Sequence, residues 1–233
     1  MTALITGASR GIGAACARAL KAAGYDVIIN YNNSEKEAQE LAKELGAKAI
    51  KADVSDAAQV RKMFEEAGSV DVLVCNAGIS MFKMFCDMTA DDWNRIFSVN
   101  FVGTVNCVEE ALPSMIHNKF GRIITMSSIW GVTGASCESA YSSTKAAIIG
   151  LSKSLAKELG PSGITVNCIA PGVIDTDMNA HLTNEDIEQL KNDTPLGEIG
   201  KCEDVCNAIL FLASDKASFI TGQIFGINGG YII

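Results

Sequence analysis

The sequence has little of what would point to a membrane, a nucleic acid or a metal ion. No apolar run in the chain approaches the roughly 20 residues of a membrane-spanning helix. Its 19 lysines and arginines are outnumbered by 27 aspartates and glutamates and form no cluster, so a basic face for nucleic acids or anionic lipids is missing. We therefore expect no nucleic-acid partner and no membrane partner.

Patterns typical of disulfides and metal ligands are also missing. The eight cysteines include no Cys-x-x-Cys pair, and the two histidines, His117 and His181, are far apart. Scattered cysteines of this kind are typical of small buried residues in a reducing compartment. The chain begins directly with an apolar stretch and shows no pattern of a secretion signal. We expect a cytoplasmic protein and assign no metal ligand.

The sequence does contain short apolar runs that alternate with longer stretches of helical period. The apolar runs predict strands near residues 2–6, 25–31, 47–51, 70–75, 121–127, 163–168 and 223–227. The helical periods predict helices near residues 11–23, 34–45, 56–67, 90–117, 139–160 and 202–213. The prediction is an α/β fold: one Rossmann-type, doubly wound, seven-stranded parallel sheet with helices on both faces, in a single domain over residues 1–233. The polar stretch 178–195 is either a mobile lid over a substrate site or an ordinary surface excursion.

A glycine-rich segment follows the first predicted strand and opens the first predicted helix. It reads Thr6-Gly-Ala-Ser-Arg-Gly-Ile-Gly13. Glycines allow the backbone to approach a pyrophosphate, which the free N–H groups and positive end of a helix stabilise. The position between a strand and a helix favours nucleotide binding over a plain turn. The residues expected at the nucleotide are Gly7, Ser9, Arg10, Gly11, Ile12 and Gly13.

The end of the second predicted strand bears on the choice of dinucleotide. An NAD site usually has an acid there for the ribose 2′-hydroxyl, but this strand ends Ile29-Asn-Tyr-Asn-Asn-Ser34. Arg10 can instead donate charge-assisted hydrogen bonds to a 2′-phosphate, and Asn32, Asn33 or Ser34 can add neutral ones. The sequence predicts NADP(H) as the cofactor. The alternative for Arg10 is a solvated surface charge.

Three polar residues form a candidate catalytic group. Tyr141 and Lys145 are four residues apart on a predicted helix and therefore share one face. A nearby ammonium favours the phenolate of a tyrosine and lowers its pKa. Ser128 closes a predicted apolar strand at its carboxyl end, where ligands bind in parallel sheets. We expect these three side chains to converge on one crevice.

These motifs together resemble the short-chain dehydrogenase/reductase family, from residue 2 to the end of the chain. Further matches are Asp53-Val54, Cys75-Asn-Ala-Gly78 with its first Asn replaced by Cys, Ser98-Val-Asn100 and Pro171-Gly172. The resemblance implies that Tyr141 protonates a carbonyl oxygen, that Ser128 polarises it, that Lys145 holds the nicotinamide ribose, and that Asn100 keeps a water for the proton relay. The implied cofactor contacts, besides the glycine-rich segment, Asn32, Tyr141 and Lys145, are Asp53, Val54, Asn76, Ala77, Gly78, Pro171, Gly172, Ile174 and Thr176. The change to Cys75 is expected to affect local packing only.

Within that family the chain is most similar to the 3-oxoacyl-acyl-carrier-protein reductases. This implies NADPH-dependent reduction of a ketone to a secondary alcohol, an acyl carrier protein as partner, and a homotetramer. Such enzymes dock the acidic carrier through basic residues beside the cleft. Lys119 stands at one such position, whereas Ser162 occupies another that often holds arginine.

The segment 128–138 also resembles reductases of the aminopentanone modification on elongation factor P. Trp130 offers an aromatic face and Glu138 a carboxylate, and this pair suits an ammonium-bearing substrate. Alternatively, Trp130 packs in the core and Glu138 caps a helix or faces solvent. A third reading is an NADP-binding regulatory protein without catalysis, which the intact catalytic group argues against.

Overall fold

Seven parallel strands form one sheet in the computed structural model, which describes residues 1–179 and 182–233 except the side chain of Met178. The order across the sheet is β3-β2-β1-β4-β5-β6-β7, so the winding reverses between β1 and β4. The strands are β1 (Thr2–Ile5), β2 (Asp26–Tyr31), β3 (Lys48–Lys51), β4 (Val72–Cys75), β5 (Gly121–Met126), β6 (Ile164–Pro171) and β7 (Ile224–Ile227). The predicted fold class is confirmed.

Helices cover both faces of the sheet, which explains why the central strands are apolar along their whole length. An apolar core containing Ala17, Leu41 and Ile209 joins one face to α1, α2 and α9. A second core containing Phe64 and Cys107 joins the other face to α3, α5 and α7. These helices are α1 (Gly11–Ala22), α2 (Glu35–Leu45), α3 (Ala57–Ala67), α5 (Gly103–Asn118), α7 (Ser139–Leu159) and α9 (Cys202–Ala213).

Shorter elements lie in the connections. They are η1 (Phe85–Asp87), α4 (Ala90–Phe97), η2 (Ser98–Val102), α6 (Ile129–Thr133), η3 (Gly160–Ser162), η4 (Asp177–Asn179), α8 (Asn184–Asp193) and η5 (Asp215–Ala217). Helix α8 lies in the polar stretch 178–195, and a capping box between Thr183 and Asp186 begins it. Whether this stretch closes over a substrate stays a prediction.

The prediction of one regular helix near residues 90–117 is wrong. Helix α4 continues into η2, a π-helical turn, before α5 begins. A π turn accommodates one extra residue in a helix and is frequent at functional sites. Residues 98–102 contain no proline and no glycine, so the sequence carries no local signal of the π-helical turn.

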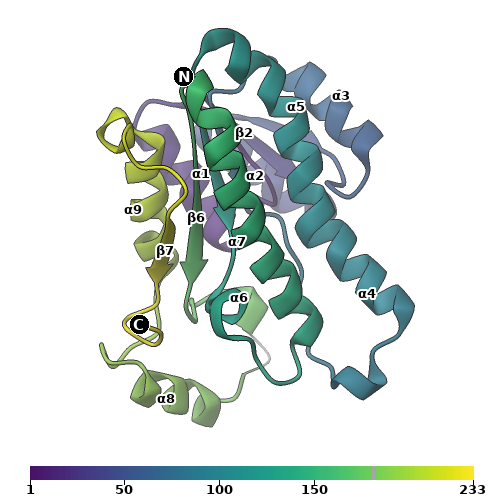
Figure 1. Cartoon of the computed structure of the whole chain (residues 1–233), viewed down its shortest axis with the longest axis vertical. Helices are drawn as coiled ribbons and strands as arrows, with labels where there is room; N and C mark the ends of the chain where they lie inside the picture. The colour runs from purple at the N-terminus through teal and green to yellow at the C-terminus, as the bar shows by residue number, and fades with distance from the viewer. Residues whose placement is uncertain (180–181) are drawn as a thin grey trace.

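The carboxyl ends of the strands define one edge of the molecule. In Figure 1 the β6 arrow points down, towards α6 and α8, while the amino terminus lies at the top. Crevices in parallel sheets open outside the carboxyl ends, at the switch point in strand order. In the part of the chain that the structure describes, no helix is long and apolar enough to cross a membrane. The described residues also contain no group of three His, Cys, Asp or Glu side chains that could hold a metal ion; His181 lies outside them.

Candidate active site

A cleft of about 900 Å³ opens at the carboxyl edge of the sheet. Its walls include most of the residues predicted to hold the cofactor: Gly7, Ser9, Arg10, Gly11, Ile12, Gly13, Asn32, Asp53, Val54, Asn76, Ala77, Gly78 and Thr176. These residues come from five separate loops, and the fold brings them together. A pocket of this size fits a dinucleotide-sized ligand.

The glycine-rich segment is shaped for close contact. Gly7 has φ +60°, and a Cβ there would lie 2.9 Å from Ala77 Cα. A Cβ on Gly13 would lie 2.6 Å from the Gly7 carbonyl oxygen and 2.7 Å from Asn76 Nδ2. Any side chain at Gly13 would therefore push the segment away from the Asn76 loop. The packing leaves the backbone exposed to the cleft as a cradle for a phosphate.

Thr6 connects the glycine-rich segment to the Asn76 loop, a role that the sequence analysis missed. Its hydroxyl accepts the N–H groups of Asn76 at 3.0 Å and Ala77 at 2.9 Å. In return, Asn76 Nδ2 donates to the carbonyl oxygens of Thr6 at 2.9 Å and Gly7 at 3.1 Å. Thr6 itself is only 2% exposed, so the four hydrogen bonds are partly buried beneath the cleft wall. Cys75, the replaced residue of this motif, packs in the buried core as expected.

The end of β2 is less free of carboxylates than the sequence suggested. Asn32 Nδ2 donates to Asp53 Oδ2 at 2.9 Å, which brings a carboxylate next to the predicted 2′-phosphate site. Arg10 lies 3.8 Å from Asp177 and its side chain is 66% exposed, so it is free to turn towards a ligand. Both its predicted role and its alternative as a surface charge are compatible with this position.

Asn30 is a structural residue of the same region. It is buried, accepts the Gly7 N–H at 3.2 Å and donates to the Ala52 carbonyl oxygen at 3.0 Å. Its side-chain amide therefore links the glycine-rich segment to the end of β2 and to the residue after β3.

The turn after β6 lies next to the glycine-rich segment. Pro171 ends β6, and the Gly172 N–H donates to the Ile227 carbonyl oxygen at 2.8 Å. Ile174 is buried, and its carbonyl oxygen anchors the Thr176 hydroxyl at 3.4 Å. A Cβ on Gly11 would lie 3.6 Å from the Thr176 methyl group, so this turn touches the nucleotide cradle.

The three predicted catalytic side chains do converge. Ser128 follows β5 and caps α6, where its hydroxyl accepts the Trp130 N–H at 3.2 Å. Tyr141 lies in the first turn of α7 and forms a hydrogen bond with Ser128. Lys145 lies one turn later, with Nζ 5.5 Å from the centre of the Tyr141 ring and donating to the Met126 carbonyl oxygen at 2.8 Å.

Burial is the largest influence on the pKa values of this group. It raises the pKa of Tyr141 to about 12; the bond with Ser128 lowers it, and the nearby Glu138 carboxylate raises it. Burial lowers the pKa of Lys145 to about 8, while Cys168 raises it. The expected lowering of the Tyr141 pKa by Lys145 is therefore wrong for this geometry. Both shifts favour the uncharged side chain.

Asn100 lies in the π turn and is fully buried. Its Oδ1 accepts the Ile79 N–H at 2.8 Å, and its Nδ2 donates to the Ile79 carbonyl oxygen at 2.9 Å and to Thr144 Oγ1 at 3.1 Å. The amide thus joins the Asn76 loop to the catalytic helix α7. A Cβ on Gly78 would lie 3.4 Å from Asn100 Oδ1 and 3.5 Å from Lys145 Nζ, so the nucleotide cleft reaches the catalytic group.

The two predicted substrate residues lie close to Tyr141 but in different settings. Trp130 is partly buried, packs in the small apolar cluster around Tyr141, and meets the Tyr231 ring edge-on at 5.9 Å between centroids. This agrees with the alternative that Trp130 is a packing residue. Glu138 precedes α7 and accepts a hydrogen bond from Ser80 Oγ at 2.7 Å. Because Ser80 lines the cleft, the Glu138 carboxylate lies at its mouth.

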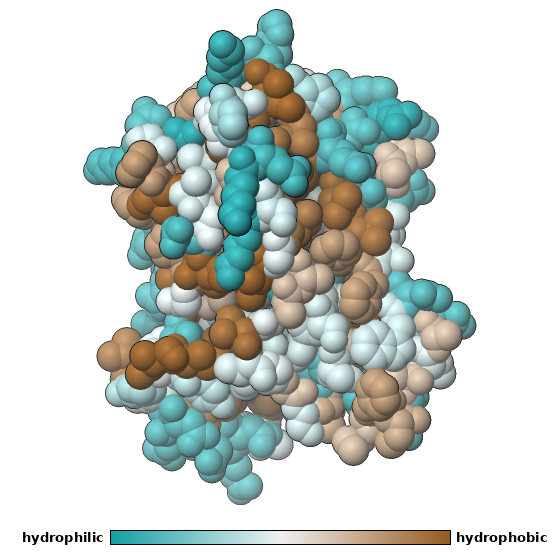
Figure 2. Space-filling view, viewed as in Figure 1, coloured by the Kyte–Doolittle hydropathy of each residue, from teal (hydrophilic) through white to brown (hydrophobic). Residues whose placement is uncertain are grey.

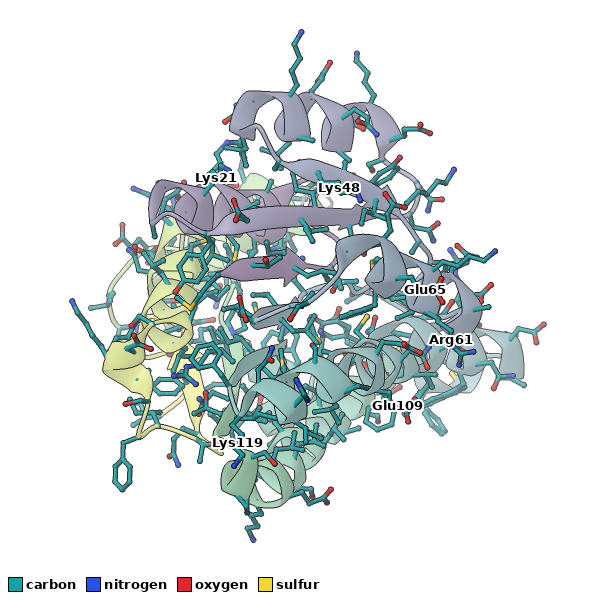
Figure 3. The ribbon with its side chains drawn as sticks, turned by 90° about the horizontal axis from the view of Figure 1, so that it is seen from above. Lys21, Lys48, Arg61, Glu65, Glu109 and Lys119 are labelled. Atoms are coloured by element: carbon teal, nitrogen blue, oxygen red, sulfur yellow. The ribbon has the colours of Figure 1, made fainter. Side chains whose placement is uncertain are left out.

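The predicted docking residues do not lie beside this cleft. Lys119 ends α5 immediately before β5, and Ser162 lies immediately before β6, so both are at the amino ends of the strands. They are neighbours there, because a Cβ on Gly163, the residue after Ser162, would collide with the Lys119 carbonyl oxygen. Figure 3 views the molecule from above, from the side of this edge, and labels Lys119. Within one chain, the expectation of a basic docking site beside the cleft is wrong.

This site defines a dinucleotide-binding oxidoreductase, and comparisons with known proteins agree. A family model described as enoyl-(acyl carrier protein) reductase matches residues 7–232. A 3-oxoacyl-[acyl-carrier-protein] reductase FabG of Staphylococcus aureus is 43% identical over 98% of this chain and 97% of its own length. The chain belongs to the short-chain dehydrogenase/reductase family and is an oxidoreductase acting on carbonyl or hydroxyl groups.

Other relatives extend the same picture. FabG of Aquifex aeolicus is 42% identical over 97% of this chain and 95% of its own. An uncharacterized oxidoreductase, YmfI of Bacillus subtilis, is 40% identical over 99% and 98%. The solved 3-oxoacyl-[acyl-carrier protein] reductase of Brucella melitensis superposes with a TM-score of 0.94 at 36% identity, covering 100% of this chain and 91% of that one. The chain therefore spans nearly the full length of its relatives.

Proposed function

We propose that the protein is an NADPH-dependent reductase that converts a ketone to a secondary alcohol, with a 3-oxoacyl thioester of acyl carrier protein as the first candidate substrate. The observation that carries this proposal is the convergence of Ser128, Tyr141 and Lys145 behind Gly78, a residue of the cleft wall that adjoins Lys145 Nζ. The names of the FabG relatives support the choice of substrate.

The residues of the cleft fit a dinucleotide. The cradle at Gly7 and Gly13 leaves no room for side chains, and backbone N–H groups at the start of α1 suit a pyrophosphate. Arg10 would pair with a 2′-phosphate, and Asn32 would add a neutral hydrogen bond. A bound nicotinamide supplies the hydride.

The chain's own groups would then handle the proton and the orientation. Tyr141, neutral because burial raises its pKa, donates its proton to the carbonyl oxygen as the hydride arrives. Ser128 donates a hydrogen bond to the same oxygen and stabilises its developing charge. Lys145 holds the nicotinamide ribose. Asn100 keeps the relay water and holds the loop at Ile79 through its two hydrogen bonds.

NADPH oxidation in the presence of an acetoacetyl thioester tests this proposal. The expected result is turnover with NADPH, much slower turnover with NADH, and a raised KM for NADPH in Arg10→Ala. Equal use of NADH would refute the cofactor, and no turnover with any ketone would favour a regulatory protein without catalysis.

A second candidate is the reductase of the aminopentanone modification on elongation factor P, favoured by the bond between Glu138 and Ser80 at the cleft mouth. One oxygen of the Glu138 carboxylate accepts the serine hydroxyl, and the other is available for an ammonium group. A partly desolvated hydrogen bond to a charged group contributes about 1.5–3 kcal/mol, or roughly a 10- to 150-fold effect on kcat/KM. Glu138→Gln should then impair an amino ketone far more than an acetoacetyl thioester. Equal effects on kcat/KM for both substrates would favour the thioester as the substrate class.

The assembly is proposed to be a homotetramer that packs through α5, α7 and the region around β7. Figure 2 shows brown apolar areas on both sides of the hydrophilic column over α7. Light scattering that gives the mass of a monomer at micromolar concentration would refute this assembly.

A further inference from the structure

An exposed apolar segment lies at the mouth of the cleft. Phe82, Met84 and Phe85 are 70%, 53% and 70% exposed, although such side chains are usually buried. Phe82 also lines the cleft. We name residues 81–88, between β4 and α4, the apolar lip. Brown-tinted atoms gather at lower right in Figure 2, where Figure 1 draws this segment below α4.

The apolar lip is held in place from two sides. The Lys83 N–H donates to the Cys137 carbonyl oxygen at 2.7 Å, and Cys137 Sγ lies 3.3 Å from Met84 Sδ. The Phe85 ring meets the Trp93 ring edge-on, with 6.1 Å between centroids. These contacts tie the lip to the loop before α7 and to α4. A surface fixed in this way loses little conformational freedom when a partner binds, so its exposed rings are preorganised.

The charges around the apolar lip are mainly negative. Asp87 and Asp91 are exposed, and Glu138 lies beside the lip, where it accepts the hydrogen bond from Ser80. Lys83 is neutralised by Asp92 at 2.6 Å. Lys83 and Thr89 lower the pKa of the Asp92 carboxyl to about 2, so this ion pair persists at neutral pH.

Arg95, a second cation of this region, lines the cleft. A partner that sits on the lip would therefore meet an apolar centre bordered by carboxylates. Exposed aromatic and methionine residues beside an active site are typical of protein-binding surfaces. Like charges placed opposite each other at an interface are unfavourable.

We propose that the apolar lip docks the protein that carries the ketone, and that the docking face of this carrier is apolar and bordered by lysines or arginines. The inference rests on the proposed function, because it requires a ketone presented at the cleft. Phe82 leads from the lip into the cleft, so a carrier seated on Phe85 delivers a side-chain ketone towards Tyr141. Of the two candidate substrates, this favours the aminopentanone modification on elongation factor P over the thioester of the acidic acyl carrier protein.

Two labelled amphipathic helical peptides with the same leucine face test the docking surface. One is bordered by lysines and the other by glutamates, and each carries a 4-oxopentanoyl group on a central lysine. Their affinities for the enzyme saturated with NADP⁺ are measured by fluorescence anisotropy. The lysine-bordered peptide should bind at least roughly tenfold more tightly, because only it complements the carboxylates.

Variants locate the binding site on the lip. Phe85→Ser should weaken the lysine-bordered peptide at least roughly tenfold, the scale of losing one buried aromatic contact. Asp87→Lys combined with Asp91→Lys should reverse the preference between the two peptides. The matched control is Phe219→Ser, at a fully exposed phenylalanine between η5 and β7, and it should leave both affinities unchanged. Reduction of the free acetoacetyl thioester of N-acetylcysteamine should stay within about twofold in Phe85→Ser, because this substrate has no carrier.

Several results would overturn the inference. Equal binding of both peptides, no binding of either, or the same loss in Phe219→Ser would each exclude the lip as a docking site of this chemistry. A change of oligomeric mass in Phe85→Ser would instead make the lip a contact between copies of this chain. If the wild-type protein reduces no free ketone, the proposed function fails, while the anisotropy result still decides whether the lip binds such a partner.

Discussion

Replacing Thr6 by valine tests the link between the glycine-rich segment and the Asn76 loop. Valine keeps the branched shape but removes the hydroxyl that accepts the N–H groups of Asn76 and Ala77. The hydroxyl also donates to the Val74 carbonyl oxygen at 3.4 Å, a long bond of little weight.

The magnitude follows from the groups left without partners. Each partly buried N–H that loses its acceptor costs about 1–3 kcal/mol, so two of them cost about 2–6 kcal/mol. The added methyl group offsets about 0.8 kcal/mol of this cost by its burial. We expect Thr6→Val to lower the free energy of unfolding by about 1–5 kcal/mol. It should also weaken NADPH binding, because Asn76 holds the Thr6 and Gly7 carbonyl oxygens through the same loop.

Urea denaturation of three proteins measures the effect. Wild type, Thr6→Val and Thr6→Ser are compared, and serine is the control because it restores the hydroxyl. Thr6→Ser should stay within about 1 kcal/mol of wild type. A loss below about 0.5 kcal/mol in Thr6→Val, or equal losses in both variants, would refute the assigned role of the hydroxyl.

Three other outcomes are expected. Tyr141→Phe should lower kcat at least roughly 100-fold with an unchanged Kd for NADPH, and near wild-type turnover in a folded variant would remove Tyr141 from the mechanism. Burial lowers the pKa of Lys145 from its ordinary value of 10.5 to about 8, so wild type should gain stability against Lys145→Met as the pH rises through this range; a constant difference in urea denaturation would contradict this. Gly13→Ala should weaken NADPH binding at least roughly tenfold in a fluorescence titration, since its Cβ would lie 2.6 Å from the Gly7 carbonyl oxygen, and an unchanged Kd would show that the cradle adjusts.

The sequence predicted the elements of the fold well because their signals are local. The apolar runs of β5 and β6 and the glycines after β1 each appear within a few residues. The convergence of Ser128 and Tyr141 could be predicted because the carboxyl ends of parallel strands meet at one edge.

Features that depend on contacts between distant segments could not be predicted. The sequence around Lys119 predicts a loop after α5. Only the direction of β5, which starts at Gly121, shows that this loop lies on the edge opposite the cleft. The Asn32–Asp53 bond joins residues of different loops, so the carboxylate beside the end of β2 could not be predicted from the strand alone. The pKa of Tyr141 depends on burial, which the spacing of Tyr141 and Lys145 does not reveal.

The π turn at residues 98–102 makes the length of this segment as important as its chemistry. Removing one residue there would convert it to regular α-helix and rotate everything that follows by about 100°. Asn100 would then turn away from Ile79, or Gly103 would turn away from Val54, where a Cβ on Gly103 would lie only 2.6 Å from Val54 Cγ2. Both contacts can be kept only with the inserted residue. A point substitution in this helix changes one side chain, whereas a deletion rotates all of α5 relative to the active site.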